Sequence, residues 1–169
     1  MLMTDMQDMA QLHALPMARA LPARRDAAAA AGTARVLLVD PQPLTRDSVA
    51  MWLRAKLGDI AVTTADGIER IASLGREGGV SLLLYHAGAG SLDTEWLGRS
   101  LAQLEHALPG VPMALLAADE EWDTIVAALR LGVHGYIPTG LSAGVLVEAI
   151  RLLCAGGTYA PVTSFLRCQ

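Results

Sequence analysis

The chain has 169 residues, enough for one domain with a packed core and too few for two ordinary ones. Hydrophobic residues make up 53 % of it and charged residues 18 %, a balance typical of an ordered α/β protein and not of a disordered chain. The formal charge is −4, and no apolar run reaches the roughly 20 residues of a membrane span. We therefore expect no direct nucleic-acid binding and no membrane insertion.

Residues 1–34 differ in composition from the rest, because they are rich in Met and Ala. They lack the basic start and continuous apolar stretch of a secretory signal. A helix over about 5–15 would end at Pro16, but its apolar stripe is short, and a mobile extension is the preferred interpretation. The two cysteines, Cys154 and Cys168, show no CxxC spacing and suit free thiols of a cytoplasmic protein.

Over about 35–160, short apolar runs alternate with longer stretches of helical period, which is typical of repeated βα units. Strands are predicted at about 35–40, 60–65, 80–85, 112–117 and 135–138. Helices are predicted at about 43–57, 67–75, 92–107, 121–131 and 142–155. This alternation predicts an α/β fold, a doubly wound, five-stranded parallel sheet with five helices, followed by a tail at 161–169.

Side chains predict the ends and faces of these helices. Asp119 is the predicted N-cap of the helix at 121–131, Ser142 is that of the last helix, and Gly156 and Gly157 end it. The helix at 121–131 carries an apolar stripe of four residues, Trp122, Ile125, Val126 and Leu129. The helix at 43–57 places four residues on one face, Val49, Trp52, Leu53 and Lys56.

Four of the predicted strands end on residues of different chemistry. They are Asp40, His86, Ala117 and Thr139, in chain order. In open parallel sheets the ligand site lies outside the carboxyl ends of the strands. We therefore expect these four residues to face one crevice, and this set is poorly suited to phosphoryl chemistry.

Three stretches of the sequence carry a resemblance to a known family: VLLVDPQPLTR at 36–46, ALRLGVHGYIPT at 128–139 and EAIRLLCAGGTY at 148–159. In this order and spacing, the chain resembles the receiver domain of bacterial response regulators, of the NarL/FixJ type. The resemblance covers about 35–160 and implies the flavodoxin-like (CheY-like) receiver fold.

In that family a strand-end aspartate accepts a phosphoryl group, further carboxylates help to hold Mg²⁺, and a hydroxyl residue and a lysine bind phosphoryl oxygens. The resemblance places Asp40 and Pro41 at the acidic pair, His86 at the phosphoacceptor, Ala117 at the hydroxyl residue and Thr139 at the lysine. Each missing contact to a transition state typically costs about 3–4 kcal/mol. We therefore expect no aspartate-type phosphotransfer, no metal site and no cofactor.

The lysine is missing whatever the alignment. The chain has one lysine, Lys56, and it falls within the first predicted helix, not at the end of a strand. No shift of register can therefore supply an ammonium group to the predicted crevice.

His86 admits three interpretations: a structural or pH-sensitive histidine near Asp40, a metal ligand together with Asp40, or a phosphohistidine acceptor. The first is preferred. The loop AGAGS at 87–91 lacks the lysine and the glycine spacing of phosphate-binding loops, so it is predicted to be a turn. Asp93 and Glu95 then supply charges to the first turn of the following helix.

Tyr136 matches, by resemblance, an aromatic position that turns inward when phosphate is bound; a half-buried aromatic without that role fits equally well. Trp122 is expected to lie partly exposed beside it, and Ile125 shares its stripe, so these residues mark a candidate interface. The resemblance places partner contacts on the helix at 121–131, the last strand and the last helix. It places self-association on the first and last helices.

The sequence therefore predicts a non-enzymatic pseudo-receiver that acts in signal transduction through a protein partner, such as a regulator or a kinase-like protein, or through a second copy. The alternative is the receiver part of a NarL/LuxR-type transcriptional regulator. Its DNA-binding domain would be absent from this chain, because only about ten residues follow the predicted fold.

Overall fold

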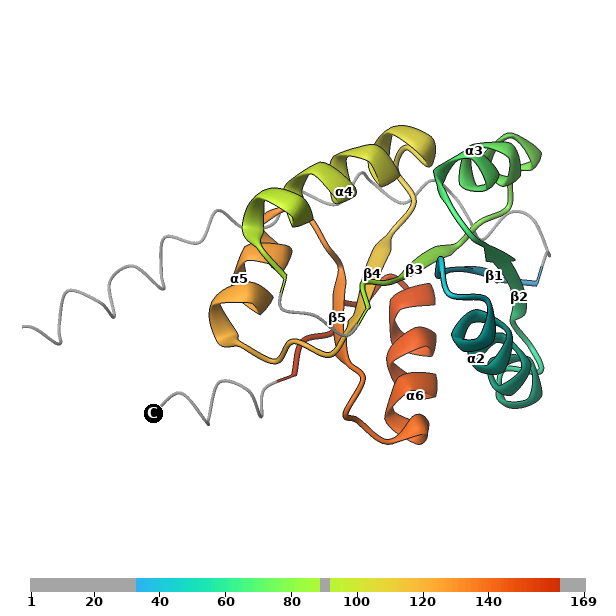
Figure 1. Ribbon diagram of the computed structural model, residues 1–169. Coiled ribbons are helices and arrows are strands. Elements are labelled where there is room, and N and C mark those ends of the chain that lie inside the picture. The colour runs from blue at the N-terminus through green and yellow to red at the C-terminus, as the bar shows by residue number, and fades with distance from the viewer. Residues whose placement is uncertain (1–32, 89–91, 162–169) are drawn as a thin grey trace, which may run out of the picture. The chain divides into compact units, whose positions relative to one another are not determined.

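A computed structural model describes residues 33–88 and 92–161 of the chain. The predicted helix at 5–15 and Cys168 lie outside these residues, as do almost all of the predicted extension and tail. The five described strands are parallel and pair in the order β2-β1-β3-β4-β5 (Figure 1). Their bounds are β1 Arg35–Val39, β2 Ala61–Ala65, β3 Leu82–His86, β4 Met113–Ala117 and β5 Gly135–Pro138.

Five described helices alternate with these strands, as the sequence predicts. Their bounds are α2 Pro43–Lys56, α3 Ile68–Glu77, α4 Thr94–Ala107, α5 Trp122–Arg130 and α6 Ala143–Cys154. Helices α3, α4 and α5 cover one face of the sheet, and α2 and α6 cover the other (Figure 1). The predicted doubly wound fold is therefore confirmed.

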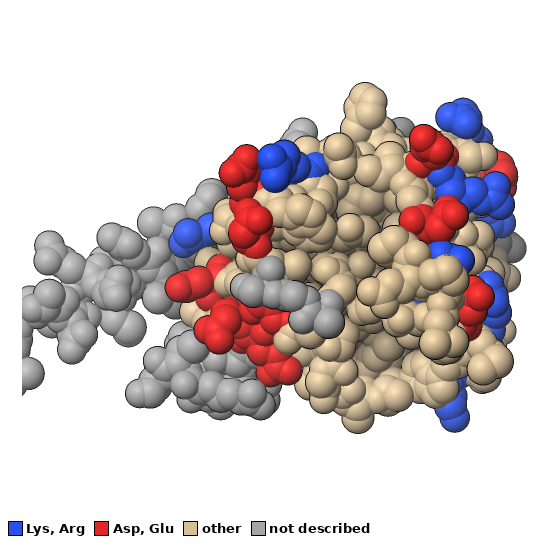
Figure 2. Space-filling view, viewed as in Figure 1, with Lys and Arg blue, Asp and Glu red and all other residues tan. Residues whose placement is uncertain are grey.

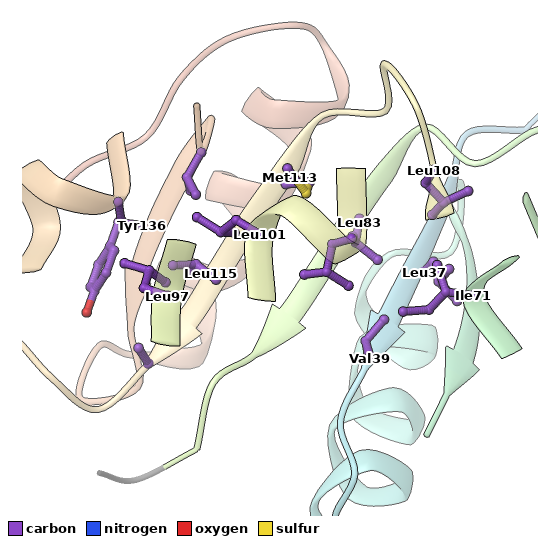
Figure 3. Close-up of a cluster of buried hydrophobic side chains, with 14 of the residues drawn as sticks. Leu37, Val39, Ile71, Leu83, Leu97, Leu101, Leu108, Met113, Leu115 and Tyr136 are labelled. Atoms are coloured by element: carbon purple, nitrogen blue, oxygen red, sulfur yellow. The ribbon is translucent and has the colours of Figure 1, made fainter. Parts of the chain in front are cut away.

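Each strand contributes to two cores because successive side chains point to opposite faces. In β1, Leu37 and Val39 enter the core under α3, α4 and α5, whereas Val36 and Leu38 enter the core under α2 and α6. Figure 3 shows the first of these cores, in which Leu37 is drawn with Leu83 and other side chains of the central strands. Burial on both faces explains why the strands read as continuous apolar runs.

The helix ends confirm some predictions and correct others. Ser142 is the N-cap residue of α6, although its side chain makes no capping bond. The N-cap of α5 is Glu121, so the prediction that Asp119 holds this position is wrong. Lys56 is exposed, and the next residue, Leu57, takes the buried place instead. A charged side chain is costly to bury, which explains why Leu57 and not Lys56 packs into the core.

Candidate functional site

The residues that end β1, β3, β4 and β5 lie in a row along one edge of the sheet. This follows from the parallel order, in which these four strands are consecutive neighbours. Asp40 directly follows β1, His86 and Ala117 are the last residues of β3 and β4, and Thr139 directly follows β5. The four residues therefore lie at one edge as predicted, and the single crevice between them stays a prediction.

Asp40 is a buried carboxylate, 2 % exposed. Its Oδ1 accepts a hydrogen bond from the backbone N–H of Gln42 at 2.8 Å, and its Oδ2 lies 2.6 Å from Nδ1 of His86. Its own N–H donates to the carbonyl of Ala65 on β2 at 3.1 Å. Both carboxylate oxygens are therefore bound by groups of the chain itself, as a buried charge requires.

The contact with Asp40 fixes the proton on one nitrogen of His86. An ionised carboxylate only accepts hydrogen bonds, so Nδ1 carries a proton and donates it. The His86 side chain is 12 % exposed, more than that of Asp40 and still largely enclosed. This arrangement matches the preferred interpretation of His86 as a histidine hydrogen-bonded to the one carboxylate of the predicted site.

No sequence pattern pointed to Arg46 at this site, and the structure shows that it binds there. The guanidinium of Arg46 donates from Nη1 to the backbone carbonyl of Asp40 at 2.9 Å. Its side chain is 17 % exposed, and its Nε lies 3.7 Å from a carboxylate oxygen of Asp47. Arg46 thus binds the backbone of Asp40, and its guanidinium pairs with the carboxylate of Asp47.

The remaining predicted site residues offer no groups for holding a phosphoryl oxygen in the way the family does. Ala117 is fully buried and ends in a methyl group. Thr139 is exposed, and its backbone N–H donates to the carbonyl of Ala117 at 2.9 Å. Pro41 is exposed and has neither a carboxylate nor an N–H group.

The magnesium ion that the receiver fold implies does not fit these residues. Mg²⁺ needs several oxygen ligands in near-octahedral geometry, commonly one or two carboxylates with waters. Asp40 is the one carboxylate at this edge that the family pattern retains, and both of its oxygens are already engaged. No group of three or more acidic, histidine or cysteine residues suited to a metal occurs within 33–88 and 92–161.

Tyr85, next to His86 on β3, adjoins the site, and the charge of Asp40 affects its pKa. Burial raises the pKa of the Tyr85 phenol, and the negative charge of Asp40 raises it further. The ring of Tyr85 stacks on that of Trp96 of α4, with centroids 6.4 Å apart and planes at 27°. This stacking ties the strand that carries His86 to the helix above it.

The predicted switch residues lie deeper than expected. Tyr136 is fully buried, so the expected half-burial is wrong, whereas its switch role stays a prediction. Its hydroxyl donates to the backbone carbonyl of Asp119 at 2.7 Å. Ile125 is also fully buried, whereas Trp122 is half-buried and packs against the same core. Trp122 therefore lies partly exposed, as predicted, and is the one member of this trio within reach of a partner.

Comparison with known proteins places this fold in a class. No family model matches the chain. A glycerol metabolism activator from Pseudomonas putida is 22 % identical over 128 residues, which cover 75 % of this chain and 57 % of that protein. The chain thus spans little more than half the length of this curated relative.

Solved structures show the likeness more directly. A LuxR family DNA-binding response regulator from Silicibacter pomeroyi is 26 % identical, with a TM-score of 0.60 and coverage of 78 % of this chain and 98 % of that one. The isolated REC domain of RcsB from Salmonella enterica serovar Typhimurium is 13 % identical, with a TM-score of 0.62 and coverage of 80 % and 98 %. The chain has the fold of response-regulator receiver domains, and the predicted resemblance is confirmed.

None of the described helices combines the length and the apolarity needed to cross a bilayer.

Proposed function

We propose that this chain is a receiver module that signals through protein contacts without being phosphorylated and without catalysing a reaction. The observation that carries the proposal is the closed set of bonds around Asp40. Gln42 and His86 occupy its two carboxylate oxygens, and Arg46 binds its carbonyl. Groups of the chain thus take the places that a divalent cation would need, and no carboxylate stands at the predicted phosphoacceptor position.

Intact mass spectrometry tests this proposal. The folded protein is incubated with acetyl phosphate and Mg²⁺, and the mass of the native chain is compared before and after. We expect no stable phosphoryl adduct. An adduct would contradict the proposal, and its loss in a His86→Ala variant would assign it to the phosphohistidine alternative.

We propose a partner surface on α2 and α6, on the evidence of their exposed apolar side chains. Four exposed apolar side chains line these two helices: Leu44 and Met51 on α2, and Val145 and Leu152 on α6. The two helices lie on the same face of the sheet (Figure 1), and the guanidinium of Arg151 on α6 binds the carboxylate of Asp59 just after α2 at 2.8 Å. On the predicted partner surface of α5, β5 and α6, Ile125 and Tyr136 are buried and Trp122 is half-buried.

Each pair on this surface is seven residues apart, so it projects from one side of its helix. Leu44 is 81 % exposed, and apolar side chains of this exposure gathered on neighbouring elements mark interaction sites. We propose that α2 and α6 form the contact with a second copy or a protein partner. Sedimentation of Leu152→Glu against Leu131→Glu tests self-association, because Leu152 on α6 and Leu131 just after α5 are 45 % and 44 % exposed. Leu152→Glu should dissociate a dimer, and Leu131→Glu should not. If the two variants sediment alike, or if the wild-type chain is a monomer, self-association is ruled out and only contact with a different protein remains proposed.

A second candidate function is the receiver part of a transcriptional regulator of the LuxR class. Two observations favour it: the curated relative is named an activator, and a similar structure is a DNA-binding response regulator. The chain covers 57 % of the activator, so a DNA-binding part would lie in sequence beyond the match. We expect this chain alone to give no DNA gel shift at physiological salt. A shift would contradict the placement of the DNA-binding part beyond the match.

A further inference from the structure

Asp119 is a buried carboxylate that the proposed function does not use. It lies between β4 and α5 and is 9 % exposed. Its Oδ2 accepts a hydrogen bond from the backbone N–H of Leu92 at 3.0 Å and another from the hydroxyl of Thr124 at 3.3 Å. Its Oδ1 accepts from the N–H of Glu121 at 2.8 Å. One side chain thus joins the loop before α4 to the first turn of α5.

The backbone of the same residue binds β5. The carbonyl of Asp119 accepts the hydroxyl hydrogen of Tyr136 at 2.7 Å, and the Tyr136 side chain is fully buried. Burial raises the pKa of the Tyr136 phenol strongly, and the negative charges of Asp119 and Glu120 raise it further, so the hydroxyl remains a donor. Asp119 therefore contacts three elements that are far apart in the sequence.

We propose that Asp119 is the positioning residue that holds the beginning of α4, the beginning of α5 and Tyr136 in one arrangement. The inference rests on the proposed function, in which the chain keeps this arrangement without a phosphoryl group. A buried carboxylate that loses a donor is left with an unsatisfied charge. Moving Leu92 or the start of α5 alone therefore breaks a bond to this carboxylate, and moving Tyr136 breaks its bond to the backbone carbonyl of the same residue.

This role bears on an acidic surface of the molecule. Figure 2 shows acidic side chains concentrated at the end of the molecule where α5 and the beginning of α4 lie. Asp93 and Glu95 begin α4, and Glu121 and Asp123 begin α5. Because Asp119 bonds to both segments, it sets the spacing between these two groups of charge.

Amide hydrogen exchange followed by NMR on the full chain tests the proposal with two aspartate variants. The side chain of Asn has only one acceptor oxygen. In Asp119→Asn, the amide N–H₂ therefore faces at least one of the backbone N–H groups that donate to the carboxylate in the wild-type chain. Asp93→Asn is the matched control, because Asp93 caps α4 by accepting from the N–H of Trp96 at 2.8 Å and Asn caps equally well. We expect the amide of at least one of Leu92 and Glu121 to exchange at least tenfold faster in Asp119→Asn, and both amides to be unchanged in Asp93→Asn.

A third variant separates a coupled arrangement from local bonds. Tyr136→Phe removes the hydroxyl that binds Asp119, and Phe fits the same buried space. The proposal predicts at least threefold faster exchange at Leu92 and Glu121, although neither residue is hydrogen-bonded to Tyr136. This variant also keeps the test decisive if Asp119→Asn does not fold.

Two results would overturn the role of Asp119: equal exchange in Asp119→Asn and Asp93→Asn, or unchanged exchange at Leu92 in Tyr136→Phe. Both leave the mass experiment untouched. A phosphoryl adduct on the wild-type chain would instead overturn the proposed function, so the two failures are distinguishable.

Discussion

Replacing His86 by alanine probes the bond that closes the site around Asp40. The substitution removes the donor that lies 2.6 Å from Oδ2, while the carboxylate stays where it is, 2 % exposed. Gln42 still binds Oδ1, and Arg46 still binds the backbone carbonyl. The variant therefore leaves one oxygen of a buried charge without its partner.

The expected loss of stability follows from the burial of both groups. Breaking a buried pair by removing one partner costs about 3–5 kcal/mol. The His86 side chain is 12 % exposed, so water can enter the space it leaves and satisfy part of the lost bond. We therefore expect the free energy of unfolding to fall by about 3 kcal/mol, at the low end of this range.

Urea denaturation followed by circular dichroism measures the effect in a double-mutant cycle with Asp40→Asn. An amide at position 40 carries no charge, so the loss of the imidazole leaves a smaller penalty in the double variant. The coupling between the two positions should amount to about 1–3 kcal/mol. His106→Ala is the control, because His106 is exposed on α4 and surface changes usually stay within about 0.5 kcal/mol. Single effects that add to within about 0.5 kcal/mol would refute the idea that His86 stabilises the buried charge.

Three further predictions concern a buried glycine and two partly buried titratable groups. Gly135→Ala should lower the free energy of unfolding by about 1–3 kcal/mol, because a Cβ there would come within 2.7 Å of a buried leucine. Gly98→Ala is the control, because Gly98 has open space around it in α4, and this substitution should raise the free energy of unfolding by up to about 1 kcal/mol. Equal urea midpoints for the two variants would contradict the prediction. Burial lowers the pKa of His134 in the folded state, so the unfolded chain binds the proton first and stability should fall as the pH drops below about 6.5; this slope should flatten in His134→Leu, and an unchanged slope would assign it elsewhere. Burial raises the pKa of Cys154 to about 11, so in a Cys168→Ser background the thiol should resist iodoacetamide at pH 8 until urea unfolds the chain; rapid labelling of the folded protein would count against it.

The strands, the helices and the edge that carries the site could be predicted from the sequence because they depend on local periodicity and on a general rule for parallel sheets. Strands buried on both faces leave continuous apolar runs, and the predicted strand ends are within two residues of those observed. Asp40 and His86 could be placed together for the same reason. The strand order that makes them neighbours follows from the fold class, and their contact follows from the order.

The bonds that hold the loops could not be predicted, because they depend on the path of each loop in space. Asp119 reads as a helix cap, since an acidic residue lies just before an apolar stripe. The helix begins later than predicted, and the freed carboxylate binds Leu92, 27 residues away. The contact between Arg46 and the carbonyl of Asp40 leaves no sequence pattern, because a backbone acceptor is present at every residue.

Lys56 shows a different limit. Residues three and four positions after Leu53 both fall near the same helix face, so periodicity alone does not choose between Lys56 and Leu57. The structure buries Leu57 and leaves Lys56 exposed at the last turn of α2. Leu57 is buried instead of Lys56 because desolvating an ammonium group is costly. A prediction from helical periodicity must therefore also consider the charge of each side chain.

The most direct test of the closed site around Asp40 is a titration of the wild-type chain with Mg²⁺ and then beryllofluoride, which mimics a phosphoryl group, followed by amide NMR. If Gln42 and His86 occupy both carboxylate oxygens, the amide resonances of these two residues should not move at millimolar ligand. Saturable shifts at both residues, with a fluorine signal of bound beryllofluoride, would show that the site accepts the cation and the anion and would contradict the account.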